Sequence, residues 1–157
     1  MALHQSVYLT DEGVENLRQE LDYLTNVKRP ALADRLHKAI QQGDLTENAD
    51  YIAAKEEQGF LEGRIQQIEV MLRNAVIIEE NGPSEEVIIG SRVTVVEEGF
   101  EDAEIFRIVG PAEADPAGGN VSHESPLGSA LLGCRVGDTV AVDAPAGEIL
   151  FRITAIQ

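Results

Sequence analysis

The sequence predicts an α+β protein in which a long antiparallel α-helical coiled-coil hairpin is followed by a small antiparallel-sheet domain. Apolar residues recur at helical spacing through the first half, whereas β-branched runs bounded by glycines fill the second. Between the halves, a charged stretch broken by Gly82-Pro83 is typical of a linker. The expected boundaries are 1–79 for the hairpin, 80–86 for the linker and 87–157 for the sheet domain.

The first helix is expected to begin after Thr10, because Thr10 can cap it and Asp11 and Glu12 place negative charge in its first turn. The apolar residues that follow recur at steps of three and four, as in a heptad repeat: Val14, Leu17, Leu21 and Leu24. Pro30 should kink the helix, since proline removes an amide donor. The pattern resumes beyond it, and Gly43 marks the expected end.

A second helix is predicted from about Thr46 to Asn74, where apolar residues again recur at steps of three and four (Leu61, Ile65, Ile68 and Leu72). Two long helices joined by a few residues must fold back on each other. From the pattern alone, the hairpin is a projecting arm, one arm of a larger bundle or a dimerising coiled coil.

The second half contains several candidate strands, namely Val87–Ile89, Ser91–Val96 and Glu104–Val109. Pro126 stands at a first-turn position and predicts a short helix through Leu132. The residues 140–142 and 149–153 flank a turn at Ala144–Gly147 and predict a hairpin.

The composition excludes several classes of protein. The formal net charge of −16, from 28 acids and 12 bases, argues against a general nucleic-acid coat, which needs a positive surface. No apolar run is long enough for a membrane span, and the N-terminus lacks the pattern of a secretory signal. The single cysteine, Cys134, suits a reducing compartment, so we expect a cytoplasmic protein.

Three carboxylates, Asp44, Glu47 and Asp50, recur at every third residue of the predicted tip. They have two explanations, which do not exclude each other. Asp44 or Thr46 caps the second helix and Glu47 completes a capping box. Alternatively, these oxygens bind Mg²⁺, which accepts one or two carboxylates together with water and phosphate. Two carboxylates are too few for a tight site, so another macromolecule would have to share the ion.

The tip also carries a longer motif. The stretch Gly43–Tyr51, with Ala53–Phe60 and Glu62–Ile65, resembles the signature of the bacterial transcript cleavage factors of the GreA/GreB family, and it fits the GreA branch better. The likeness extends to Ile108–Gly110 and Val136–Asp138 and so covers nearly the whole chain. It implies a C-terminal domain similar to the FK506-binding fold, without prolyl isomerase activity. Two departures are that Asp50 stands where the family usually has Glu, and Cys134 where a basic residue is common.

The resemblance implies a transcription elongation factor that binds bacterial RNA polymerase in stalled elongation complexes. The hairpin would enter the secondary channel and stimulate the polymerase's own cleavage of backtracked RNA, so the polymerase remains the enzyme. Asp44 and Glu47 would be the catalytic residues and would hold a Mg²⁺ ion shared with the polymerase, which the isolated protein does not bind tightly. For Asp50 two roles stay open, a contribution to metal binding or helix capping alone. Some members of the family inhibit the polymerase and have altered tips, whereas this chain keeps both acids and is expected to support cleavage.

The remaining candidates are contact residues. The basic residues of the hairpin are candidates for the extruded RNA 3′ end, and their alternative role is to pair with neighbouring acids: Lys28, Arg35, Lys38, Lys55 and Arg64. Ser125, Pro126 and Leu127 are candidates for contact with the polymerase, and their alternative is a helix cap with a buried leucine. Sequence-specific DNA binding is not expected. Two rival functions are a structural coiled-coil adaptor and a free-standing nuclease.

Overall fold

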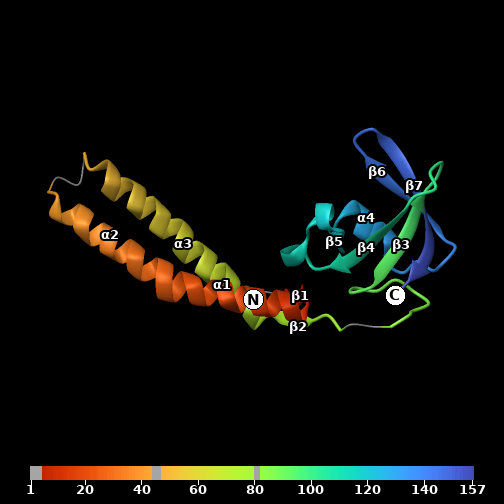
Figure 1. Cartoon of the computed structure of the whole chain (residues 1–157), viewed down its shortest axis with the longest axis horizontal. Coiled ribbons are helices and arrows are strands. Elements are labelled where there is room, and N and C mark those ends of the chain that lie inside the picture. The colour runs from red at the N-terminus through yellow and green to blue at the C-terminus, as the bar shows by residue number, and fades with distance from the viewer. Residues whose placement is uncertain (1–4, 44–46, 80–81) are drawn as a thin grey trace. The chain divides into compact units, whose positions relative to one another are not determined.

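The computed structural model describes residues 5–43, 47–79 and 82–157, which form two compact units (Figure 1). The helical unit is built on Val14–Ala75, and the sheet unit on Ser6–Gly13 together with Val76–Gln157. The expected division into 1–79, 80–86 and 87–157 stays a prediction, and part of its linker, residues 80–81, lies outside the described residues.

The helical unit confirms the predicted hairpin. Its first arm consists of α1 (Asp11–Tyr23), a π-helix η1 (Leu24–Lys28) and α2 (Arg29–Gln41), and its second arm is α3 (Ala49–Arg73). The two arms lie side by side (Figure 1), and the apolar repeat faces inward, because the buried cluster between them is made of repeat positions and Ala54: Leu24, Leu32, Leu36, Ala54, Leu61, Ile65 and Ile68. Among the described residues, no helix has both the length and the apolarity of a membrane span.

The disturbance expected near Pro30 takes the form of η1. The amide of Arg29 donates to the carbonyl of Leu24, five residues back, and Pro30 follows inside the first turn of α2. Because proline has no amide hydrogen, a wider turn just before it lets the arm continue without a break.

The second arm begins later than the sequence predicts. The expected start was Thr46, whereas α3 starts at Ala49, since Asn48 has an extended backbone (φ −89°, ψ 96°) and acts as the N-cap. Its end at Arg73 lies close to the expected Asn74.

The larger sheet of the sheet unit contains five strands in the order β5-β4-β3-β7-β6. These strands are β3 (Arg92–Glu97), β4 (Ala103–Val109), β5 (Asn120–Ser122), β6 (Thr139–Ala144) and β7 (Gly147–Ile156). Helix α4 (Pro126–Leu131) packs on one face, where Val93, Val95, Phe151 and Ile153 form the core with Leu131. Two 3₁₀ turns, η2 (Pro111–Glu113) and η3 (Pro116–Gly118), join β4 to β5.

The sheet unit differs from expectation in two ways. Val87–Ile89 is not a strand, because the amide of Val87 donates to Cys134 and its carbonyl accepts from Gly133 instead of a neighbouring strand. The β4–β5 pair is parallel, although the other pairs of this sheet are antiparallel. A separate two-stranded sheet joins β1 (Val7–Leu9) to β2 (Ala75–Ile77).

Candidate functional site

The tip of the hairpin is the short connection between α2 and α3. Gly43, just after α2, has φ +109°, a left-handed conformation that favours glycine. Asp44 lies outside the described residues, so its assignment stays a prediction. Glu47 is described and exposed, and no hydrogen bond or ion pair joins its carboxylate to another residue in the described ranges 5–43, 47–79 and 82–157. Its charge is therefore free of any observed partner in this part of the chain.

Asn48, which sequence reasoning missed, holds the two arms together beside the tip. Its Oδ1 accepts a hydrogen bond from the Tyr51 amide at 3.1 Å and so caps α3. Its Nδ2 donates to the Ala39 carbonyl of α2 at 2.8 Å. The available signal was that asparagine is among the preferred N-cap residues. The observed cap is Asn48, and Glu47 immediately precedes it, so Glu47 is not the third helical residue that a capping box needs.

The third acid of the tip, Asp50, lies in the first turn of α3 and faces the opposite arm. The Nε and Nη2 atoms of Arg35 each lie 3.3 Å from Asp50 Oδ1, and Arg35 Nη1 lies 2.6 Å from Glu57 Oε2. Arg35 therefore bridges two acids of α3. Asp50 is already neutralised in part by this bridge, which distinguishes it from Glu47.

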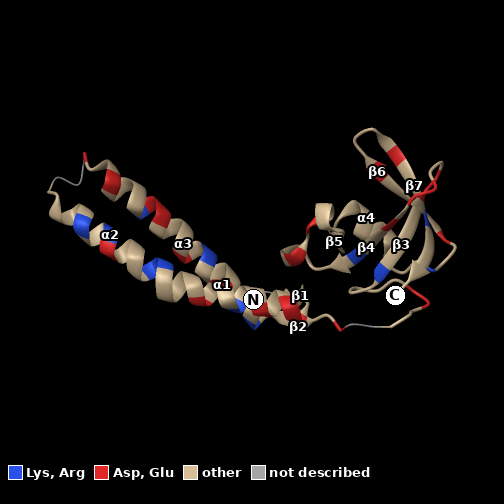
Figure 2. Cartoon of the chain, in the orientation of Figure 1, with Lys and Arg blue, Asp and Glu red and all other residues tan. Residues whose placement is uncertain are grey.

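Two of the other basic candidates also form ion pairs. Arg64 forms a two-point contact with Glu20 of α1, with distances of 2.7 and 2.9 Å, and Lys38 lies 3.0 Å from Asp34. Figure 2 shows blue and red segments interleaved along both arms. The alternative of pairing with neighbouring acids is thus observed for Arg35, Lys38 and Arg64.

Lys28 and Lys55 differ from these three. Within the described ranges neither forms an ion pair, and Lys55 Nζ donates only to the amide oxygen of Gln58. Lys28 lies in η1 and lines a shallow hollow of ≈ 230 Å³ with Tyr23 and Val27. These two lysines are the hairpin candidates whose charge is available to an anion.

A tightly bound metal needs more ligands than the described part of the tip offers. Among the described residues, no group of three or more His, Cys, Asp or Glu side chains could hold a metal ion. The exposed carboxylate of Glu47 fits Mg²⁺ only as a partial ligand set, because Mg²⁺ retains water and takes other ligands from its substrate. Asp44, the other expected ligand, lies outside the described residues.

The segment 125–127 opens helix α4. Ser125 Oγ accepts from the Gly128 amide at 3.0 Å and donates to the Ser122 carbonyl at 2.7 Å, so it is the N-cap. Leu127 packs against the core, whereas Pro126 is exposed. The helix-cap alternative is therefore observed for Ser125, and Pro126 is the residue of the three whose side chain is open to a partner.

Comparison with known proteins assigns both halves of the chain to one family. The family model described as "Transcription elongation factor, N-terminal" matches residues 7–77, and the model described as "Transcription elongation factor, GreA/GreB, C-term" matches residues 82–157.

Individual relatives match over their full length. The chain is 48% identical to the transcription elongation factor GreA of Geobacillus kaustophilus, with 100% of both chains covered, and 47% identical to that of Bacillus subtilis, again with 100% of both covered. Among solved structures, the GreA factor homolog 1 (Gfh1) of Thermus thermophilus is 33% identical over 98% of this chain and 99% of its own, with a TM-score of 0.45.

Proposed function

The chain belongs to the GreA/GreB family of transcription elongation factors, and we propose that it rescues stalled bacterial RNA polymerase by stimulating cleavage of backtracked RNA. The hairpin enters the secondary channel of the polymerase and brings its tip to the active site. The observation that carries this proposal is the exposed Glu47, which ends a long two-helix arm and takes no part in capping α3.

The dimensions of the hairpin suit this role. Helix α3 has 25 residues, which corresponds to a length of about 37 Å at 1.5 Å per residue. Cross-helix ion pairs and a buried apolar seam keep the arm stiff along this length. A stiff arm holds a carboxylate in place at the end of the hairpin at a lower entropic cost than a flexible loop.

Asp44 and Glu47 are the residues that would hold a Mg²⁺ ion shared with the polymerase. A pair of metal ions about 4 Å apart activates water and stabilises the leaving oxygen in phosphodiester hydrolysis. The two carboxylates add negative charge where the second ion is weakly held, and so raise its occupancy. On this proposal the polymerase is the catalyst and this protein, acting in the cytoplasm, is its stimulator.

The basic residues are proposed to contact the extruded RNA 3′ end, and the ion pairs that they form support an order among them. Lys28 and Lys55 have no observed acidic partner in the described chain, whereas Arg35, Lys38 and Arg64 would have to leave theirs. We therefore place the main RNA contact on Lys28 and Lys55. Contact with phosphate is independent of base sequence, so no sequence-specific DNA binding is proposed. The exposed Pro126 beside Ser125 and Leu127 is proposed to dock on the polymerase surface.

The test replaces the two tip acids in the full chain. Asp44→Asn and Glu47→Gln keep side-chain size but remove the charge, and the observed cap, Asn48, is left in place. We expect each variant to bind the polymerase normally and to slow RNA cleavage in a backtracked complex by about 100-fold, as for loss of an electrostatic catalytic group. Raised Mg²⁺ should restore part of the rate, because mass action offsets the lost affinity.

The matched control is Glu56→Gln, which removes one exposed charge from the same helix. It should leave the cleavage rate unchanged. Normal cleavage by both tip variants, with binding intact, would mean that the tip acids take no part in cleavage, as expected for a structural adaptor. Cleavage of free RNA by the wild-type protein with Mg²⁺ and no polymerase would instead make it a nuclease.

A further inference from the structure

The sheet unit has a face that α4 does not cover. Residues directly opposite each other in a strand pair point to the same face, and Val93 pairs with Phe106 on the core side. The neighbouring positions therefore lie on the other side. We use the name outer face for the part of this surface that is formed by Arg92, Thr94, Val96, Ile105, Arg107 and Arg152.

The outer face gathers positive charge in an acidic unit. Residues 82–157 contain 13 acids and four bases, and three of those bases, Arg92, Arg107 and Arg152, lie on this face. None of the six outer-face residues is acidic. By the same alternation, the opposed acids Asp143 and Glu148 lie on this side of the sheet as well, at the end of the β6–β7 hairpin, four positions from Arg152. The three arginines therefore form a positive patch, and acids lie on the same side of the sheet only farther along the β6–β7 hairpin.

The arginines of this patch have no acidic partner among the described residues. Arg92 lies directly opposite Arg107, an arrangement that is unfavourable for like charges. In the described part of the chain none of the three forms an ion pair, and Nε of Arg107 is buried without a hydrogen-bond acceptor. A buried donor without an acceptor is costly, and no contact in the described chain compensates the charge of Arg107.

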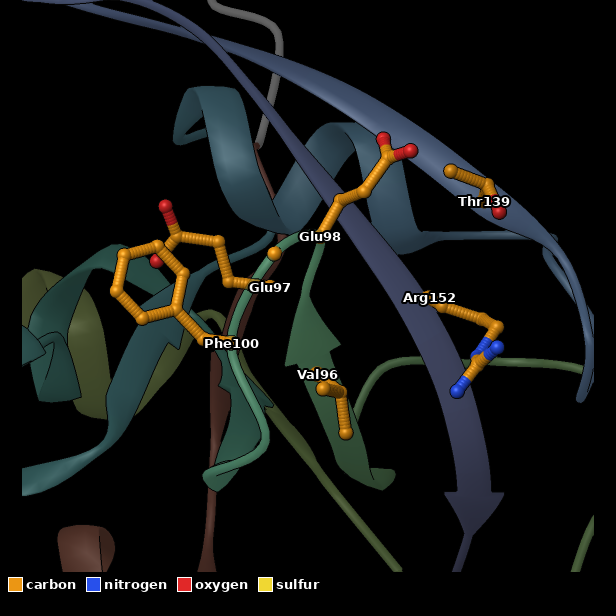
Figure 3. A pocket seen from close by; sticks show the side chains of 7 residues that line it. Val96, Glu97, Glu98, Phe100, Thr139 and Arg152 are labelled. Atoms are coloured by element: carbon orange, nitrogen blue, oxygen red, sulfur yellow. The ribbon is translucent and has the colours of Figure 1, made fainter.

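Apolar surface lies among these charges. Ile105 is 62% exposed and stands next to Arg107 on the same face of the sheet. At the other end of the face, Val96 and Arg152 line a hollow of ≈ 240 Å³ with Thr139 and the turn that ends at Phe100 (Figure 3). Arg152 is exposed, and in that view its guanidinium and the carboxylate of Glu98 point in different directions.

The charge and residue types of the outer face indicate which class of partner it binds. A nucleic-acid surface depends on a strong excess of positive charge, which this unit lacks. Arginine beside an exposed aliphatic side chain, with no lysine, is instead typical of protein–protein interfaces. We propose that the outer face binds a protein surface that presents carboxylates around an apolar side chain, and, resting on the function proposed above, that this surface belongs to RNA polymerase.

The strand register gives the spacing that the partner must match. Arg92 and Arg107 are adjacent, and Arg152 pairs with Val96, four positions along β3 from Arg92. With about 3.3 Å per residue and about 4.8 Å between strands, Arg152 is about 14 Å from Arg92 at the backbone. The partner therefore presents two acidic groups on either side of an apolar contact. This docking surface is distinct from Ser125–Leu127, which lies on α4 at the opposite face of the sheet.

The experiment uses Arg92→Glu in the full chain, because this variant separates binding from folding. A glutamate opposite Arg107 replaces a like-charge pair with an opposite-charge pair, so the melting temperature should stay the same or rise. Affinity for purified bacterial RNA polymerase without nucleic acid, measured by fluorescence anisotropy, should fall at least tenfold. The matched control, Arg135→Glu, reverses the charge of the fourth arginine of this unit, which is exposed and lies outside the outer face. It should change the affinity less than twofold.

The cleavage assay distinguishes this inference from the proposed function. Arg92→Glu should reach the wild-type cleavage rate at saturating concentration, whereas the tip variants should bind normally and cleave slowly. Unchanged affinity of Arg92→Glu, with wild-type binding intact, would overturn the docking surface and leave the proposed function standing. An effect seen only when nucleic acid is present would also overturn it, since the partner would then be RNA or DNA. Failure of the wild-type protein to bind the polymerase would overturn both.

Discussion

Asn48 shows how one side chain can fix the position of a functional tip. Its amide accepts from the first turn of α3 and donates to the last turn of α2, so both arms are tied beside Glu47. Gly43 allows the left-handed turn that precedes this point. Since Asn48 satisfies the free amide of Tyr51, the neighbouring carboxylate of Glu47 is not needed for capping and is left for another task.

Replacement of Asn48 should separate its two contacts. Asn48→Ala removes both and should destabilise the chain by about 1–2 kcal/mol, the usual cost of losing an N-cap. Asn48→Asp keeps the cap acceptor but loses the donor to Ala39, so its loss should be smaller. Urea unfolding measures both, and Asn16→Ala, at an exposed position of α1, serves as the control with little or no loss. Equal stability of the wild type and Asn48→Ala would contradict the clamp.

At the scale of the helical arms, arginines join α3 to the opposite arm at three levels. Arg64 contacts Glu20, Arg29 contacts Glu62 at 2.8 Å through two nitrogens, and Arg35 contacts Glu57. Two-point contacts of this kind restrict geometry more than a single lysine contact does. They reinforce the register that the apolar seam sets, although each is exposed enough to add only modestly to stability.

Acid should weaken the contact between Glu20 and Arg64. Hydrogen bonds from Arg64 hold the pKa of the Glu20 carboxyl below its ordinary value. Because the pKa is lowered in the folded state, the stabilisation is present above the unfolded pKa of about 4.3 and is lost as the pH falls through the folded pKa.

Thermal unfolding between about pH 6 and pH 3 tests this dependence. Glu20→Gln should be less stable than the wild type at neutral pH by about 1 kcal/mol or less, and the two should converge in acid. Glu56→Gln, which alters an exposed acid without an observed partner in the described residues, should keep the wild-type profile. A constant difference between Glu20→Gln and the wild type across this range would argue against the assignment.

The elements also show where sequence reasoning succeeds. The hairpin was predictable because a long apolar repeat specifies both a helix and its buried face. Strands β1, β2 and β5, with three residues each, are too short to leave a pattern. Val87–Ile89 has the composition of a strand, but its hydrogen bonds to the loop at 133–134 prevail over propensity.

The candidate site could be predicted only in part from the sequence. The roles of Asp44 and Glu47 came from a family motif, and Asn48 was missed because the capping box favoured an earlier start of α3. The ion pairs of Arg35 with Asp50 and of Arg64 with Glu20 depend on the register between the two arms. The spacing of residues within one helix does not contain this register.

At the scale of the whole chain, one compact unit is built from two segments that are far apart in the sequence. Residues 6–13 group with the sheet unit, although they precede the helical unit in sequence. Leu9 is fully buried, and the Tyr8 ring meets that of His123 edge-on with centroids 5.4 Å apart. Gly110 is needed opposite Tyr8, because a Cβ there would lie 2.2 Å from the Tyr8 carbonyl oxygen.

Glu113 is the residue that ties this N-terminal segment to the sheet unit. Its carboxylate accepts from the Thr10 amide at 2.7 Å and from the Thr10 hydroxyl, across 103 residues of sequence. Thr10 is itself the N-cap of α1, since its Oγ1 accepts from the Gly13 amide at 3.0 Å. One buried threonine thus links the start of α1 to the loop that follows β4.

Glu113→Gln should therefore destabilise the full chain by about 1–3 kcal/mol, because an amide offers one acceptor oxygen where the carboxylate offers two and leaves a buried donor of Thr10 unpaired. Hydrogen exchange at the Thr10 amide should accelerate by more than exchange in the strands β3 and β7. Glu124→Gln removes an exposed acid from the same unit and should change neither quantity. If the Thr10 amide kept its protection in Glu113→Gln, the pairing of β1 with β2 and the packing of Leu9 and Tyr8 would be enough to hold the segment 6–13. The hydrogen bonds of Glu113 would then contribute nothing to the fold.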